Sequence, residues 1–121
     1  MFAESISGSI SNDFYSWDPS SLEWRNLSNA SARTPSPQQH FGMACVDDQL
    51  FVFGGDNETT VLNELYEYKI SSREWNLVNI SDSGPTQRTG HGFASALGNL
   101  YVFGGLDRSG DSEHSLRCKQ L

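Results

Sequence analysis

The sequence predicts an all-β fold in which one unit of antiparallel strands is repeated. The block LFVFGG at residues 50–55 returns as LYVFGG at residues 100–105, which is 50 residues later. The block NDFYSWDPSSLEWRNL at residues 12–27 returns as NELYEYKISSREWNLV at residues 63–78, which is 51 residues later. Hydrophobic residues make up only 36% of the chain and glycine occurs 11 times, a composition that suits short strands and many turns. Two independent blocks with nearly one period therefore indicate a repeat protein.

Each complete repeat is expected to contain four strands. They are predicted at residues 41–46 (matched by 93–97), at 50–53, at 65–70 and from residue 74 onward. The second is a continuous apolar run, which is typical of a central strand buried on both faces. The third alternates, with Tyr66, Tyr68 and Ile70 on one face. Gly98 and Asn99 predict a two-residue hairpin, so each strand is expected to pair with its neighbour in sequence.

These motifs together resemble the kelch repeat. The resemblance consists of a glycine pair after an apolar strand, an asparagine and an acidic residue that open a strand carrying tyrosine, and a tryptophan further on. The residues that carry it are Gly54, Gly55, Gly104, Gly105, Tyr15, Tyr66, Trp24 and Trp75. It covers about residues 2–105 and implies a β-propeller built from antiparallel four-stranded blades.

The repeated residues are expected to serve the structure. A glycine pair at the end of a crowded strand allows a positive φ or close packing where a Cβ atom would clash. The large aromatic residues Trp24, Trp75, Tyr66 and Phe103 are expected to fill the core between adjacent sheets. Cys45 is expected to be a free, buried thiol, because neither it nor the chain's other cysteine lies at a metal-ligand spacing.

The repeats divide the chain into parts that do not complete a ring. We expect the last two strands of one blade at 1–32, a complete repeat at 33–80, the first two strands of another blade at 81–106 and a disordered polar tail at 107–121. Closed propellers have four to eight blades, so this incomplete propeller is expected to be a fragment from a truncated gene model, a split gene or an excised piece. Exposed blade edges are expected to favour association.

The expected topology gathers the longer loops at one end of the blades. In a four-strand meander, the second-to-third connection and the connection to the next repeat leave from the same end, and loops there commonly bind partners. The kelch resemblance implies a protein or peptide partner at this end. The candidate contact residues are Arg88, Gln38, Asp56, Asn57, Asp107 and Arg108. Arg88 stands at the arginine position of the motif, and a guanidinium group suits capture of a carboxylate.

The sequence favours a binding scaffold that is not an enzyme. It contains no GxSxG elbow, HExxH helix or phosphate-binding glycine loop, so no catalytic, cofactor-binding or metal-binding residue and no cofactor is predicted. His40 and His91 are not equivalent ligands, because the 50-residue register pairs His91 with Phe41. Part of a propeller enzyme and an extracellular or carbohydrate-recognising module remain the alternatives, since a fold alone does not fix a function.

Charge and targeting signals limit the expected partners and the expected compartment. The net charge of −7 would repel a phosphate backbone, which excludes nucleic acid as an expected partner. No membrane segment and no signal peptide is visible in the chain, which slightly favours the cytoplasm. Asn26, Asn29, Asn57 and Asn79 lie in Asn-x-Ser/Thr triplets, which are glycan acceptors if the parent protein is secreted and chance matches if it is not. The compartment stays open.

Overall fold

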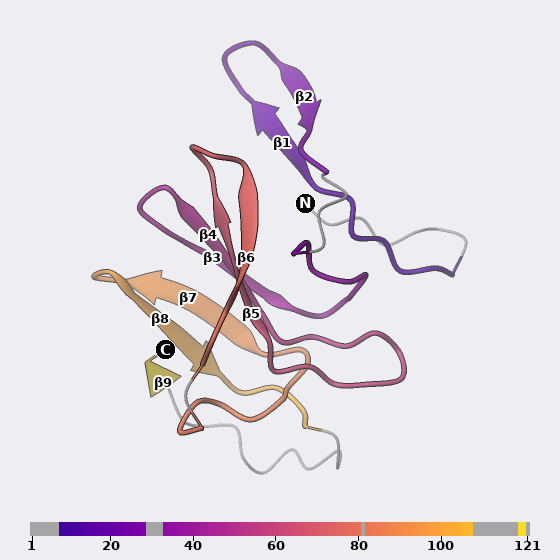
Figure 1. Ribbon diagram of the computed structural model, residues 1–121, viewed down its shortest axis with the longest axis vertical. Coiled ribbons are helices and arrows are strands. Elements are labelled where there is room, and N and C mark those ends of the chain that lie inside the picture. The colour runs from indigo at the N-terminus through magenta and orange to yellow at the C-terminus, as the bar shows by residue number, and fades with distance from the viewer. Residues whose placement is uncertain (1–7, 29–32, 81, 108–118, 121) are drawn as a thin grey trace.

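The computed structural model describes residues 8–28, 33–80, 82–107 and 119–120. Within these residues the chain forms three antiparallel sheets and no helix (Figure 1). The strands are β1 (Tyr15–Asp18), β2 (Glu23–Asn26), β3 (Gly42–Val46), β4 (Gln49–Phe53), β5 (Leu65–Lys69), β6 (Glu74–Val78), β7 (Gly92–Ala96), β8 (Asn99–Phe103) and β9 (Lys119–Gln120). The sheets do not close into a ring. The predicted all-β fold with an antiparallel four-stranded blade is confirmed.

The central sheet is a complete four-stranded meander in the order β3-β4-β5-β6. Val52 of β4 lies opposite Met43 on one side and opposite Tyr66 on the other. Because β4 has a strand on each side and sheets on both faces, Val52 and Phe53 are fully buried. Burial on both faces therefore explains the continuous apolar run from which the central strand was predicted.

The first sheet repeats the second half of the central sheet. Its two strands, β1 and β2, place Trp17 opposite Trp24, just as β5 and β6 place Tyr68 opposite Trp75. Every pair in the first sheet becomes a pair of the central sheet when 51 is added to both residue numbers. The backbone register is therefore the same in the two repeats.

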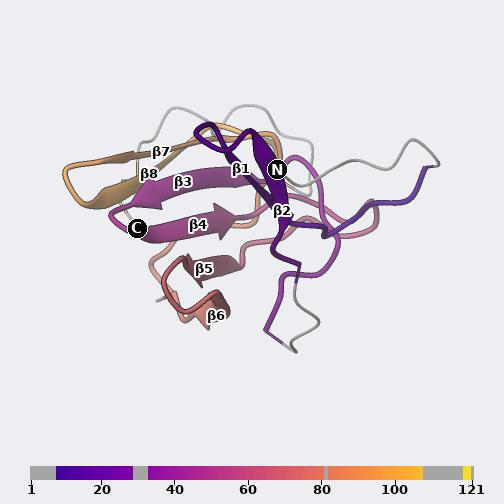
Figure 2. The same cartoon turned by 90° about the horizontal axis from the view of Figure 1, so that it is seen from above.

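The third sheet repeats the first half of the central sheet. Its strands β7 and β8 place Gly92 opposite Phe103, as β3 and β4 place Gly42 opposite Phe53. The inner strands β3 and β7 lie beside each other, so the third sheet packs next to the central one (Figure 2). The 50-residue period of the sequence is thus a step from one sheet to the next.

The short strand β9 falls within the polar tail expected at residues 107–121. Lys119 lies opposite Val102 and Gln120 lies opposite Tyr101, so β9 takes the place beside β8 that β5 takes beside β4. The sequence did not predict this pairing, because residues 119 and 120 carry no strand pattern. Most of the tail lies outside the described residues.

Two apolar clusters hold the sheets together. One is made of Phe14, Val52, Tyr66, Tyr68 and Trp75. The other is made of Phe53, Leu65, Leu100 and Val102. Phe14 comes directly before β1, and its ring centroid lies 4.8 Å from that of Tyr68 in an edge-on contact. Each cluster therefore joins the central sheet to a neighbour, which is the packing expected of adjacent blades.

The prediction that all four large aromatic residues are core residues is wrong for two of them. Trp75 is 2% exposed and Tyr66 is buried, as predicted, whereas Trp24 is 58% exposed and Phe103 is 47% exposed. Trp75 is covered because β4, β5 and Phe14 surround it. Trp24 contacts Trp17 of β1, but its sheet has only two strands among the described residues, and these leave the tryptophan more than half exposed.

Cys45 also differs from expectation. The thiol is free, as predicted, but it is exposed instead of buried. Cys45 lies in β3, which is the edge strand of the central sheet, and the strand beside it in the pairing order is β4 alone. A small apolar residue on an edge strand is covered only if a neighbouring element packs on it.

The glycine pairs mark a close backbone approach that is the same in both repeats. A Cβ atom on Gly55 would lie 2.5 Å from the carbonyl oxygen of Gln39, and one on Gly105 would lie 2.8 Å from that of Thr89. Gln39 and Thr89 are 50 residues apart, as the two glycines are. The glycines are therefore required by sterics, in agreement with the role expected for them.

Gly54 offers a direct test of this steric role, with Gly90 as its control. Both have nearly the same φ, 66° and 63°, but a Cβ atom on Gly54 would lie 2.6 Å from the carbonyl oxygen of Arg88, whereas Gly90 has open space. Gly90→Ala is expected to lower the free energy of unfolding by about 1–2 kcal/mol through φ strain alone. Gly54→Ala should cost about 1–3 kcal/mol more, because the backbone must move.

Urea unfolding monitored by tryptophan fluorescence measures both losses. Equal losses for Gly54→Ala and Gly90→Ala would show that the close approach beside Gly54 contributes nothing to stability.

Candidate functional site

The long connections meet at one end of the sheets, as the topology predicted. The β4–β5 connection pairs with the segment before β3 through Gln39 and Asp56, and the next repeat forms the same bridge through Thr89 and Leu106. The tight turns lie at the opposite end (Figure 1). We call the end with the long connections the loop face and define it as residues 35–41, 54–62 and 82–91.

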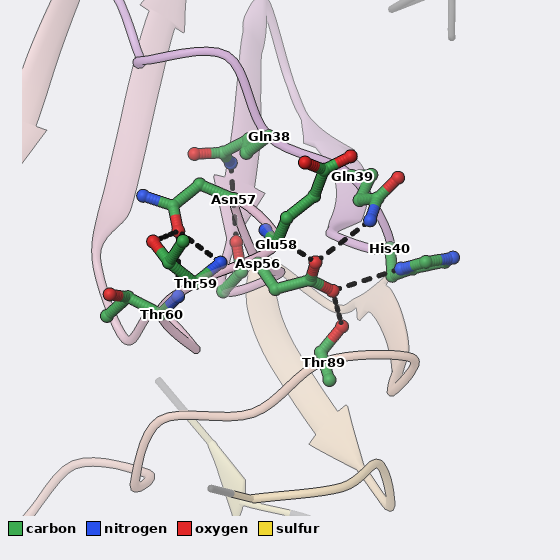
Figure 3. A network of polar contacts seen from close by, with 10 residues as sticks. Gln38, Gln39, His40, Asp56, Asn57, Glu58, Thr59, Thr60 and Thr89 are labelled. Carbon is green, nitrogen blue, oxygen red and sulfur yellow. Dashed lines mark hydrogen bonds and ion pairs between the residues drawn. The ribbon is translucent and has the colours of Figure 1, made fainter. Parts of the chain in front are cut away.

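Asp56 is the centre of a polar network on the loop face (Figure 3). Its Oδ1 accepts hydrogen bonds from Gln39 Nε2 at 3.0 Å and from the backbone N of Glu58 at 3.2 Å. Its Oδ2 lies 2.6 Å from Thr89 Oγ1, which donates, and 3.0 Å from His40 Nδ1. One carboxylate therefore holds together three segments that are far apart in sequence.

The pKa of Asp56 reflects these contacts. Burial alone would raise it, but the hydrogen bonds from Thr89, Gln39 and His40 outweigh burial and lower the pKa from 3.8 to about 2. The carboxylate is thus charged at neutral pH, and its side chain is only 15% exposed. Thr89 belongs to the segment that leads into the third sheet, so the network also ties one blade to the next.

Asn57 shapes the outermost turn of the β4–β5 connection. Its Oδ1 accepts hydrogen bonds from Thr59 N at 3.2 Å, Thr59 Oγ1 at 3.0 Å and Thr60 N at 2.8 Å. Such side-chain contacts to the following backbone are typical of asparagine in turns. Glu58, Thr59 and Thr60 are exposed on this turn. The fixed turn therefore presents these side chains to solvent.

Gln38 and Arg88 perform one structural task in successive repeats. Gln38 Nε2 donates to the carbonyl oxygen of Gly54 at 3.3 Å, and Arg88 Nη1 donates to that of Gly104 at 3.0 Å. Gln38 is 3% exposed and cannot reach a partner unless the strand end opens. The spacing of 16 residues from each side chain to its glycine is the same in both repeats, and this repetition is the sequence signal for the role.

Asp107 and Arg108 are the remaining two predicted contact residues. Asp107 is half-buried beside the end of the third sheet, where it follows the bridge between Thr89 and Leu106. Arg108 lies outside the described residues. Of the predicted residues, Asp56 and Asn57 therefore lie at the centre of the loop face, while Gln38 and Arg88 support the glycine pairs.

His91, which the sequence analysis did not select as a site residue, also lies at this end. It is buried beside Gly54 and Gly105, and its ring centroid lies 5.4 Å from that of Phe53. Burial, and then the charge of Arg88, lower the pKa of His91 from 6.5 to about 4. The 50-residue register pairs His91 with Phe41, and this pairing indicated that residue 91 occupies an apolar position.

Two further findings concern only the part of the chain that the structure describes. In these residues no three histidine, cysteine, aspartate or glutamate side chains lie close enough together to hold a metal ion. The same residues contain no helix with the length and apolar character needed to span a membrane.

Acid is expected to destabilise the folded chain in two steps. The unfolded chain binds a proton on His91 near pH 6.5 but the folded chain only near pH 4, so stability is lost as the pH falls between these values. For Asp56 the same argument places a second loss between pH 3.8 and about pH 2. Thermal unfolding followed by circular dichroism over this pH range measures both steps.

His91→Phe is the matched variant, because Phe41 holds the corresponding position in the preceding repeat. It is expected to remove the first loss and to keep the second. Identical acid curves for the two chains would exclude His91 as the source of the first step.

The repeats and the loop face can be compared with known proteins. A family profile described as the KLHDC2/KLHL20/DRC7 Kelch-repeats domain matches residues 3–119. The chain is 32% identical over 114 residues to the Rho GTPase-activating protein gacHH of Dictyostelium discoideum, covering 93% of the chain and 7% of that protein. It is also 32% identical over 116 residues to N-(sulfonatooxy)prop-2-enimidothioate sulfolyase of Thlaspi arvense, covering 93% of the chain and 33% of that protein.

A human protein shows the same similarity. The chain is 31% identical over 99 residues to the Rab9 effector protein with kelch motifs of Homo sapiens, covering 80% of the chain and 26% of that protein. The chain thus spans a third or less of the length of these relatives, whose names describe different activities. The matched profile, the paired glycines and the repeated strand registers all lead to one conclusion: the chain belongs to the kelch-repeat family.

Proposed function

We propose that this chain is a non-enzymatic scaffold that binds a protein or peptide through its loop face. The observation that carries the proposal is the network around Asp56, which orders the connections of the loop face on which it lies. Ordered surface loops on a rigid sheet scaffold are the usual location of binding residues. The human relative is named as an effector of Rab9, which supports a role in binding another protein.

The turn that Asn57 fixes is the proposed contact surface. Glu58, Thr59 and Thr60 are exposed there, and their backbone is held by hydrogen bonds to Asp56 and Asn57. A turn that is already ordered loses little conformational entropy on binding. Because the chain carries a net charge of −7, we propose a partner surface that brings positive charge or amide donors.

Of the residues expected to contact a partner, those we retain are Asn57, Asp107 and Arg108, while Asp56 orders the turn that carries Asn57 and Glu58. Arg88→Ala is a poor test of binding, because loss of the hydrogen bond to Gly104 would disturb the third sheet. A useful test must change an exposed side chain and leave the support of the glycine pairs in place.

Charge reversal at Glu58 tests the proposal, with Asp48 as the matched control. Both residues are acidic and exposed, but Glu58 lies on the loop face and Asp48 lies in the β3–β4 turn at the opposite end. Immobilised Glu58→Lys chain is expected to lose proteins that the unchanged chain recovers from a lysate, because an acidic contact is reversed. Asp48→Lys is expected to recover them. Quantitative mass spectrometry measures the difference.

Circular dichroism spectra should first show that both variants are folded. Equal recovery by the two variants, or a loss confined to Asp48→Lys, would contradict binding through the loop face.

The second candidate function is catalysis as part of a propeller enzyme. It is favoured by the 32% identity to the sulfolyase of Thlaspi arvense over 93% of the chain. The corresponding test is incubation with an N-(sulfonatooxy)prop-2-enimidothioate and chromatographic measurement of its loss. Consumption above that of the heat-unfolded chain would replace the scaffold proposal, whereas no consumption is expected if the chain only binds a partner.

A further inference from the structure

Equivalent asparagine residues in the two repeats have different surroundings. Asn12 Nδ2 donates a hydrogen bond to the carbonyl oxygen of Pro35 at 3.1 Å, and Asn12 is half-buried. The repeat counterparts of these residues are Asn63 and Pro85. Within the described part of the chain no hydrogen bond joins Asn63 to Pro85, and Asn63 is exposed. A contact that is closed in one repeat is therefore open in the next.

The open contact lies in a pocket with a volume of about 270 Å³ on the loop face. The pocket is lined by Asn63, Ile80, Asp82, Gly84, Pro85 and Thr86. These residues belong to the connections on either side of β5 and β6, so the pocket is formed around the complete central sheet. Sites for small molecules usually have volumes of roughly 300–1,000 Å³, so this pocket suits one amino-acid side chain better than a cofactor.

The pocket accompanies a difference in length and in charge between the two connections. Pro35 comes 23 residues after Asn12. In the next repeat the same step, from Asn63 to Pro85, is 22 residues. The shorter connection also carries Asp82 three residues before its proline, where the longer connection has an alanine. The second repeat thus adds a carboxylate to the contact that it leaves open.

The polar groups of the pocket specify the chemistry of its occupant. Asn63 Nδ2 is a donor, whereas the carbonyl oxygen of Pro85 and the carboxylate of Asp82 are acceptors. A primary carboxamide matches this set, because its oxygen accepts a hydrogen bond and its NH2 group donates two. Ile80 is half-buried in the lining and offers apolar surface to the methylene groups of a side chain.

Charged side chains match the pocket less well. A carboxylate has no proton to donate and would be repelled by Asp82. A lysine or arginine side chain has no acceptor for Asn63 Nδ2. A cation would also approach the guanidinium group of Arg88, which is hydrogen-bonded to Thr86 in the pocket wall at 3.1 and 3.2 Å. A neutral carboxamide avoids both charge conflicts.

We infer that this pocket takes the carboxamide of a glutamine side chain of the partner. The inference rests on the proposed function, because it supplies an anchor for a peptide bound to the loop face. The glutamine oxygen accepts from Asn63 Nδ2, which has no bond of the kind that Asn12 makes to Pro35. The glutamine NH2 group donates to Asp82 and to the carbonyl oxygen of Pro85.

NMR titration of the 15N-labelled chain with N-acetylglutamine N-methylamide tests the pocket by itself. The side-chain NH2 signals of Asn63 are expected to shift and to saturate, whereas those of Asn12 stay in place because that amide is bonded to Pro35. N-acetylglutamate N-methylamide is the control ligand, since it differs only in its side-chain carboxylate, and no saturable shift is expected. Equal shifts with both ligands, or no shift at Asn63, overturn the inference.

Selection of random phage-displayed peptides on the immobilised chain tests the pocket in partner binding. Enriched peptides are expected to share a glutamine at one position. Asn63→Ala should bind them about fivefold more weakly, because one hydrogen bond is lost. Asn63 is exposed, so this change leaves the fold in place. Asp48→Ala, in the exposed β3–β4 turn at the opposite end, is the control and should bind them unchanged.

The outcomes separate the pocket from the proposed function. Peptides that bind Asn63→Ala as well as the unchanged chain, but fail to bind Glu58→Lys, overturn the glutamine pocket and leave binding through the loop face in place. A selection that enriches no peptide contradicts the proposed function, and the NMR titration then decides the pocket alone.

Discussion

The structure depends on one close backbone approach, at which the segment entering each sheet crosses the glycine pair that ends the second strand. At the central sheet, Gly55 N donates to the carbonyl oxygen of Arg88 at 2.9 Å, and Arg88 N donates to that of Leu62 at 3.0 Å. The side chain of Arg88 reaches Gly104 in the next sheet. Arg88 thus joins a strand end, a loop and the following blade. The packing of the sheets and the order of the loop face therefore depend on the same contacts.

The loop face is polar, yet the carboxylate at its centre is hydrogen-bonded within the chain. Both carboxylate oxygens of Asp56 take part in polar contacts within the chain, with Gln39, His40 and Thr89. This arrangement separates the residues that order the face, such as Asp56, from exposed turn residues such as Glu58. The relatives of the chain are named for different activities, as expected for a scaffold whose fold does not fix its function.

The repeat period, strand order and register could be predicted from sequence, because glycine pairs and alternating aromatic residues depend on local backbone geometry. The position of Asp56 and Asn57 at the end with the long connections followed from topology. Burial could not be predicted as well: Trp24 has the sequence surroundings of Trp75, but its exposure is decided by which strands lie beside it. The hydrogen bond of Gln38 could not be predicted either, because its carbonyl partner lies 16 residues away and is brought to it by packing.

The two repeats differ in length by one residue between the last strand of one sheet and the first strand of the next. Counted from the equivalent residues Leu27 and Val78, this connection covers residues 28–41 in one case and 79–91 in the other, one residue fewer, while the strand pairs on either side keep their register. The blades therefore tolerate a change of length in this connection without any change in their strand pairing.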